Sequence, residues 1–175
     1  MSSFSRNRRS ASRHDPPARE VWTASRFVPA EAPAVLASLT DPELIGVWAP
    51  IDFEVDGLEG RRLRSGSHAW VNGSLGGVSA EFEIDVLRAD ERGLRLAARG
   101  PVGLDVDYRI APAETGVMVE AEITLQRERG LSGRVLRAAT GALLSGGALD
   151  RALRRLAGEL AALHELDETE FALAA

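Results

Sequence analysis

The 175-residue sequence contains no cysteine and no lysine. The absence of cysteine excludes disulfides, thiolate nucleophiles and metal sites built on thiolates. Because all 21 basic residues are arginine, Schiff-base chemistry, lysine-tethered cofactors and a Walker A phosphate loop are excluded as well. No metal or cofactor is expected from the residues that remain.

Long apolar runs are also missing. None approaches the roughly 18 residues that cross a membrane, and the chain does not open on a signal-peptide pattern. We therefore expect a cytoplasmic protein without a transmembrane segment. The net charge of −5 argues against general nucleic-acid binding, which needs a basic surface, so no nucleic-acid partner is expected.

The ends of the chain differ in composition from its middle. Residues 1–18 are rich in Ser, Arg and Pro, and such a segment buries too little surface to offset its ordering entropy. We interpret it as a disordered arm, or as an electrostatic attachment to an acidic partner. Residues 19–166 are expected to form one folded domain, and residues 167–175 an acidic and apolar tail.

The first part of the domain predicts a strand and two short helices. Residues 20–28 favour a strand, and the prolines at 29 and 33 suit entry into a helix near residues 30–38. In the segment Thr40-Asp41-Pro42-Glu43, Thr40 is the expected N-cap of a second helix that ends near Trp48.

From residue 51 the apolar period changes to two, which is typical of antiparallel strands with one dry and one wet face. The predicted strands are 51–56, 62–73, 78–86, 92–100, 102–110 and 117–125. Acidic and arginine-bearing strands alternate in this order, with Arg62 and Arg64 on one basic strand and Arg95 and Arg99 on the other. We expect these charges to pair across the wet face.

After residue 130 the period becomes helical, and one apolar stripe dominates: Leu149, Leu153, Leu156, Leu160 and Leu163. Glycines 141, 146 and 147 predict a kink or break before that stripe. The fold class is therefore α+β, with a curved antiparallel sheet of about seven strands around a long C-terminal helix, and two short helices after the first strand.

This order of elements resembles the START-related, polyketide cyclase-like superfamily (SRPBCC), which has the helix-grip fold. The resemblance rests on the segment Leu39–Trp48 (LTDPELIGVW), on Gly100-Pro101 between two strands, and on the Leu-spaced terminal helix, and it covers about residues 20–164. It implies a cavity between sheet and helix that holds an apolar or amphipathic small molecule of the lipid, quinone or polyketide kind.

Several side chains are candidates for lining such a cavity, with plain core packing as the alternative. They are Trp48, Phe53, His68, Trp70, Phe82, Leu104, Tyr108, Leu149 and Leu153. Tyr108 stands out because a buried phenol needs a hydrogen-bond partner, and a ligand oxygen would serve.

The facing of His68 and Trp70 stays open in the sequence. If Ala69 and Val71 face inward, both point to solvent, whereas a bulge near Gly66 would turn them into the cavity. An inward His68 would be a candidate acid, base or ligand-orienting group, and Tyr108 is the other weak catalytic candidate.

Three functions follow from these observations. The first is binding of an apolar small molecule, the second a polyketide aromatase/cyclase-type enzyme, and the third an interaction protein that acts through its basic arm. A homodimer is compatible with each of them.

Overall fold

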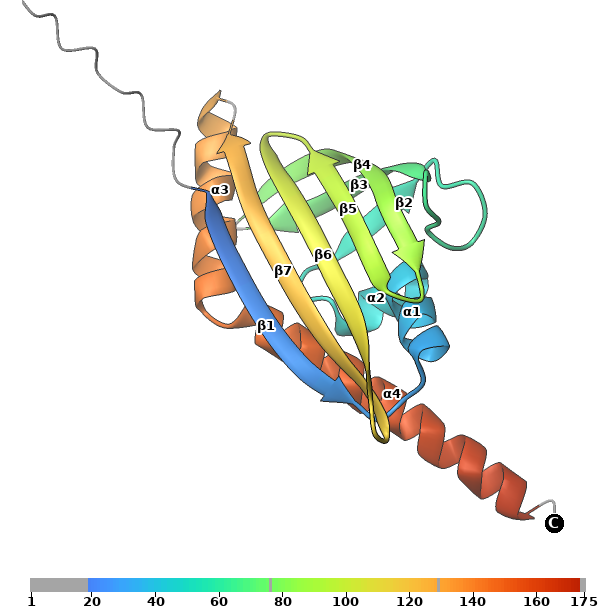
Figure 1. Cartoon of the computed structure of the whole chain (residues 1–175). Helices are drawn as coiled ribbons and strands as arrows, with labels where there is room; N and C mark the ends of the chain where they lie inside the picture. Colours follow the sequence, from blue (N-terminus) through green and yellow to red (C-terminus); the bar gives the residue numbers. More distant parts are fainter. Residues whose placement is uncertain (1–18, 76, 129, 174–175) are drawn as a thin grey trace, which may run out of the picture.

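The computed structural model describes residues 19–75, 77–128 and 130–173. The elements follow one another as expected from the sequence, with seven strands and a helical C-terminal part (Figure 1). They are β1 (Glu20–Val28), α1 (Ala32–Thr40), α2 (Pro42–Trp48), β2 (Phe53–Asp56), β3 (His68–Leu75), β4 (Val78–Asp90), β5 (Gly93–Arg99), β6 (Val102–Ala113), β7 (Gly116–Glu128), α3 (Gly130–Ser145) and α4 (Ala148–Leu173). The predicted arm, residues 1–18, lies outside the described residues.

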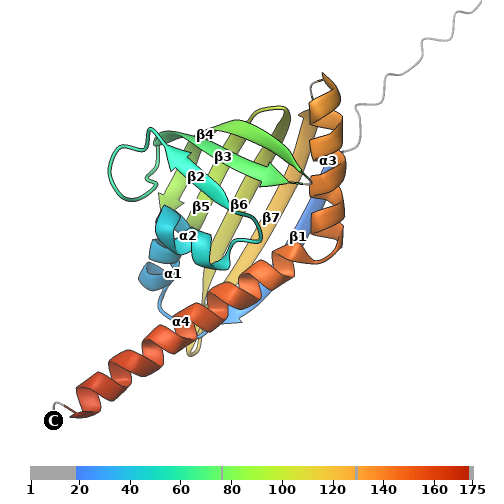
Figure 2. The same cartoon turned by 180° about the vertical axis from the view of Figure 1, so that it is seen from behind.

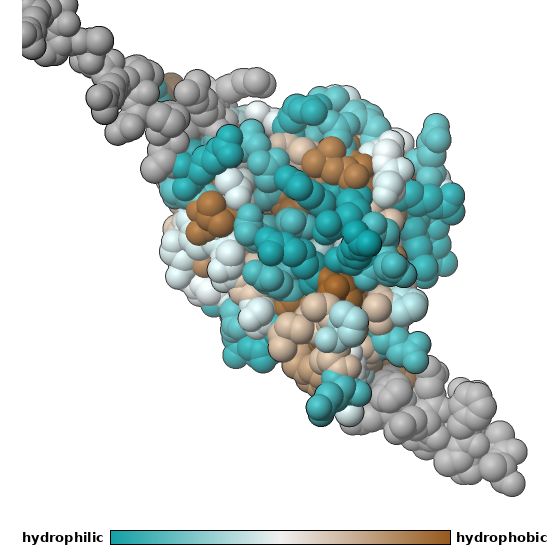
Figure 3. Space-filling model, in the orientation of Figure 1, coloured by the Kyte–Doolittle hydropathy of each residue, from teal (hydrophilic) through white to brown (hydrophobic). Residues whose placement is uncertain are grey.

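The strands form one antiparallel sheet in the order β1-β7-β6-β5-β4-β3-β2. The first strand therefore lies beside the last, and β1 and β2 are the two edges. The sheet curves, with α3 and α4 on its concave side (Figure 2). Alternation along each strand sends apolar side chains to this concave face and polar ones to the convex face, which is mostly hydrophilic (Figure 3).

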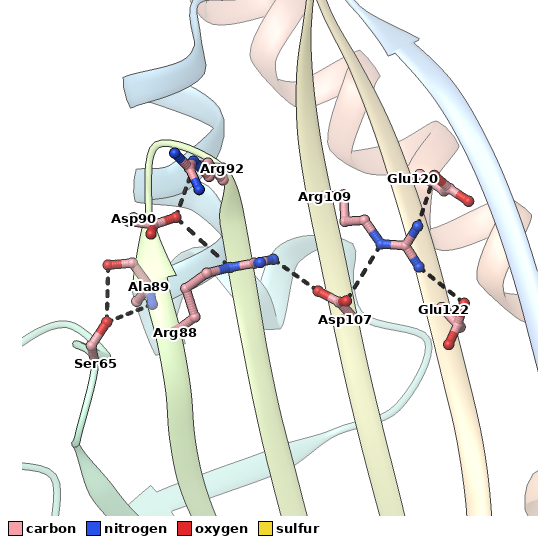
Figure 4. A network of polar contacts seen from close by, with 9 residues as sticks. All are labelled: Ser65, Arg88, Ala89, Asp90, Arg92, Asp107, Arg109, Glu120 and Glu122. Atoms are coloured by element: carbon pink, nitrogen blue, oxygen red, sulfur yellow. Dashed lines mark hydrogen bonds and ion pairs between the residues drawn. The ribbon is translucent and has the colours of Figure 1, made fainter.

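Charge pairing on the convex face is confirmed in one half of the sheet. Arg99 of β5 lies 2.6 Å from Asp85 of β4. Arg88 bridges to Asp107 at 2.9 Å, and Arg109 contacts Glu122 at 3.0 Å and Glu120 at 3.4 Å (Figure 4). These carboxylates are thus part of a solvated, cross-paired surface, where each pair contributes about 0–1 kcal/mol.

The other predicted basic strand is wrong. Strand β3 begins only at His68, so Arg62 and Arg64 lie in the preceding loop. There Arg61 Nε and Arg62 Nε lie 3.2 and 3.7 Å from a carboxylate oxygen of Asp41, which is buried. A buried carboxylate needs such partners, and this need outweighs pairing with the acidic strands.

The predicted cap at Thr40 is also wrong by one residue. Asp41 is the N-cap of α2, since its side chain accepts a hydrogen bond from the Glu43 backbone N–H at 3.2 Å. Thr40 is the last residue of α1, and its hydroxyl donates to the Leu36 carbonyl at 2.7 Å. Asp41 is the single residue between the two helices.

The predicted break before the C-terminal helix is confirmed. Helix α3 ends at Ser145 and α4 begins at Ala148, and Gly147 between them has a φ of +80° that favours glycine. The apolar stripe of α4 is buried from Leu149 to Leu160. Helix α4 packs mainly against β1 and continues to Leu173, beyond the boundary expected at residue 166.

Candidate functional site

The concave face of the sheet is closed at two places. A large apolar cluster joins α1, α2 and α4 to one end of the sheet and includes Val35, Leu94, Val119 and Leu153. A small second cluster lies under α3 and consists of Val102, Leu125 and Leu136. Both clusters are buried, and they lie on either side of the middle of the sheet.

Between the clusters, inward-facing apolar side chains are only half-buried. We call them the central strip: Val71, Phe82, Leu96, Leu104, Val106 and Ile123. Val71 pairs with Phe82, Leu96 with Val106, and Val106 with Ile123, so the strip crosses five neighbouring strands. Middle positions of a covered sheet are normally its most buried ones, and the accessibility of the strip means that other side chains cover it incompletely.

Tyr108 borders the central strip. It follows Val106 on the same face of β6 and packs edge-on against Trp48, with ring centroids 5.9 Å apart. Its hydroxyl forms no hydrogen bond within the described residues. Among the described residues, the fully enclosed side-chain atoms without a hydrogen-bond partner are Arg26 Nε and Arg88 Nε, and the Tyr108 hydroxyl is not one of them. The phenol oxygen is therefore unpaired within the described residues and not completely enclosed.

The electrostatic state of Tyr108 follows from its burial. The residue is 8% exposed, and desolvation raises the pKa of its phenol to about 12. The hydroxyl therefore stays protonated at neutral pH. It can donate a hydrogen bond to an acceptor, but it is a poor proton donor in acid catalysis.

Trp48, Leu149 and Leu153 close the site on the side of the large cluster. The indole Nε1 of Trp48 donates to the Ser38 carbonyl at 3.2 Å, and the side chain is buried. Trp48 thus forms the end wall beside Tyr108. Leu149 and Leu153 of α4 are buried in the same large cluster as Trp48 and Tyr108.

Phe53 lies at the other edge of the sheet. It is half-buried and pairs with Gly73 of β3. Together with Ala80 it lines a shallow groove of about 530 Å³, whose other walls carry Asn72, Ser74 and Glu81. Phe53 is thus separated from Tyr108 by most of the width of the sheet.

His68 and Trp70 point to solvent, so the inward alternative is wrong. Trp70 is 41% exposed while Ala69 between them is 1% exposed. The pairing of β3 with β4 runs from His68 to Leu75 without a shift, and no bulge turns the strand over. His68 Nδ1 lies 3.1 Å from Asp85 Oδ1, and this contact is the main cause that lowers the pKa of the Asp85 carboxyl.

Two charged residues that the sequence analysis did not single out lie on the inner side of the edge strand β1. Arg26 Nη2 contacts Asp150 Oδ1 of α4 at 2.9 Å, and Glu20 Oε1 contacts Arg137 Nη2 of α3 at 2.6 Å. Their positions follow from the alternation with Trp22 and Ala24, which was available in the sequence. Both charges are compensated by partners on the helices.

Two absences concern the residues that the structure describes. No group of three or more His, Asp or Glu side chains there is placed to hold a metal ion. No helix there is both long and apolar enough to cross a bilayer.

Comparison with known proteins identifies the family. Residues 19–161 match the family described as polyketide cyclase/dehydrase and lipid transport. No curated protein matches.

Solved structures support the fold. A START superfamily protein from Mycobacterium smegmatis is 17% identical with a TM-score of 0.60, over 82% of this chain and 98% of that one. An aromatase/cyclase from Streptomyces sp. R1128 is 14% identical with a TM-score of 0.60, over 82% and 94%. The KanY protein is 19% identical with a TM-score of 0.60, over 82% and 98%. With its helix-grip architecture and a family match over most of its length, the chain belongs to the polyketide cyclase/dehydrase and lipid transport family.

Proposed function

We propose that this protein binds an apolar or amphipathic small molecule over the central strip of the concave face. The observation that carries the proposal is the strip itself, because six inward-facing apolar side chains from five strands are left half-buried between two packed clusters. Covering them with a ligand removes apolar surface from water, at roughly 25 cal/mol per Å². The family description, which names lipid transport, is consistent with such a ligand.

The two ends of the central strip differ in polarity, so an amphipathic ligand would bind in one orientation. At one end, Tyr108 and Trp48 offer a free hydroxyl beside aromatic surface. Toward the other end lie Phe82 and Leu104, which pack against apolar side chains of both the large and the small cluster. An amphipathic molecule would place its polar end at Tyr108 and its apolar part along the strip.

The test uses Nile red, a neutral apolar dye whose fluorescence reports its environment. In Val106→Phe the larger ring fills the middle of the strip, and we expect the affinity for the dye to fall about tenfold, which corresponds to about 1.4 kcal/mol. The matched control is Val21→Phe, because Val21 is 51% exposed on the convex face. This control should bind the dye as the wild type does.

Thermal unfolding of the same variants separates a binding site from a sealed core. Overpacking a closed core costs about 1–3 kcal/mol, whereas an open strip accepts the larger ring at little cost. Retained stability with lost binding supports the proposal. Unchanged dye affinity in Val106→Phe, or an equal loss in both variants, would refute it.

A cyclase-type enzyme is the second candidate, since the family description names polyketide cyclases and one structural relative is an aromatase/cyclase. Of the two catalytic candidates, His68 lies on the convex face and leaves only Tyr108 beside the strip. A phenol with a pKa of about 12 would act there by orienting a carbonyl rather than by proton transfer. Binding without chemistry therefore ranks first.

The interaction function depends on residues 1–18, which lie outside the described residues. Deleting them and comparing localisation and partner binding with the full chain tests it. The cytoplasmic location and the homodimer stay predictions from the sequence.

A further inference from the structure

The proposed function leaves the chemical class of the ligand undefined. The distribution of charged side chains around the central strip indicates whether that ligand is neutral or ionised. None of the six residues of the central strip is charged or polar. The large and small clusters that border the strip likewise consist of apolar side chains, Tyr108 excepted. A ligand on the strip therefore meets no fixed charge from the sheet.

On the inner side of the sheet, the edge strand β1 carries two charged groups, Glu20 and Arg26, and each already has a partner. Arg26 is held by Asp150, whose second carboxylate oxygen contacts Arg154 at 2.6 Å. The hydrogen bond from Arg26 is the main cause that lowers the pKa of the Asp150 carboxyl, so Asp150 stays ionised beside Arg26. Glu20 is paired with Arg137. Arg26 Nε has no partner but is enclosed by protein atoms, and the Nη2 atoms of Arg26 and Arg137 are held in ion pairs. An anionic ligand could therefore reach these Nη2 groups only by breaking an ion pair.

Among the side chains named for the strip and its two borders, Tyr108 offers a polar contact to a ligand. Its hydroxyl has no partner among the described residues and is a donor, so it matches an acceptor oxygen such as that of an ester, ketone or quinone. An ionised carboxylate placed there would lose its hydration and gain only one hydrogen bond from a neutral donor, so its binding would be unfavourable.

Resting on the proposed function, we infer that the site selects electrically neutral ligands that present an acceptor oxygen to Tyr108, and that it discriminates against fatty-acid-like carboxylates. Tyr108 is then the specificity-determining residue of the site. The strip itself sets how much apolar surface the ligand can bury.

The test compares a dansyl-labelled undecanoic acid with its methyl ester by fluorescence titration at about pH 8, where the free acid is ionised. The two probes share the chain and the label and differ at one end, where the ester carries a methyl group in place of the negative charge. We expect the wild type to bind the ester at least about tenfold more tightly than the acid. In Tyr108→Phe the ester should lose about three- to tenfold in affinity, the range expected for one hydrogen bond, while the acid changes little.

The variant is expected to fold, because Tyr108→Phe removes only a hydroxyl that has no partner in the described structure; thermal unfolding checks this. Equal or tighter binding of the acid would overturn the inference, and so would an equal effect of Tyr108→Phe on both probes. If neither probe nor Nile red binds, the proposed function itself fails, and the inference falls with it. Val106→Phe should weaken both probes, which separates loss of the strip from loss of the hydroxyl.

Discussion

At the scale of single residues, Tyr108 combines burial, a free hydroxyl and a position beside the central strip. It is the only tyrosine in the chain, so the ultraviolet absorbance of tyrosinate reports this residue alone. Burial raises its pKa from 10.0 to about 12. We predict a titration midpoint near 12 for the folded protein and near 10 after unfolding in denaturant.

The raised pKa also predicts how Tyr108 affects stability. The folded state holds the proton more tightly than the unfolded state, so its contribution is fully present below about pH 10 and is lost as the pH rises toward 12. Because Tyr108→Phe cannot ionise, the variant should show a smaller loss of stability over this window. A wild-type midpoint near 10 in the folded protein would contradict the burial of Tyr108.

At the scale of elements, two glycines give opposite predictions. A Cβ on Gly93 at the start of β5 would lie 1.9 Å from the Tyr108 carbonyl oxygen, and its φ is +126°. Gly93→Ala should therefore destabilise the protein and displace the strand that carries Tyr108. A Cβ on Gly158 in α4 meets nothing within 4 Å, so Gly158→Ala should stabilise by about 0.5–1 kcal/mol.

Chemical unfolding of the two alanine variants measures both effects. If Gly93→Ala were as stable as the wild type, the close approach of β5 to β6 at that point would be wrong. A destabilised Gly158→Ala would instead indicate that α4 is packed at Gly158 by a surface absent from the described residues.

The sequence predicted most elements, because their cause is local. Strict alternation specified the strands, and the leucine spacing specified α4. The cap of α2 was placed one residue early although the contact that defines it, from the Glu43 N–H to Asp41, is local. The start of β3 was misplaced because Arg61 and Arg62 of the preceding loop contact the buried Asp41, and that contact is nonlocal. No spacing rule in the sequence links Asp41 to a loop twenty residues later.

The candidate site was predicted in part. Phe82, Leu104 and Tyr108 were placed on the dry face, and the structure puts them in or beside the central strip. Trp48 was expected to line the cavity or to pack in the core, and it is a buried wall beside Tyr108. His68 and Trp70 stayed open because alternation alone cannot exclude a bulge, and only the continuous pairing of β3 with β4 excludes it.

At the scale of the whole molecule, the site exists because the helical part of the chain is broken. The turn at Gly146 and Gly147 sends α3 over one end of the sheet and α4 across the other (Figure 2). One straight helix would cover a single band of the sheet. Which inward-facing side chains stay half-buried depends on this arrangement, and for that reason the sequence could not predict the strip.

The location of a bound apolar ligand tests the account most directly. We would follow the methyl resonances of Val, Leu and Ile by NMR while Nile red is added. The account predicts that shifts concentrate on Val71, Leu96, Leu104, Val106 and Ile123. Shifts confined to methyl groups of the convex face, such as those of Val21 and Leu87, would contradict it.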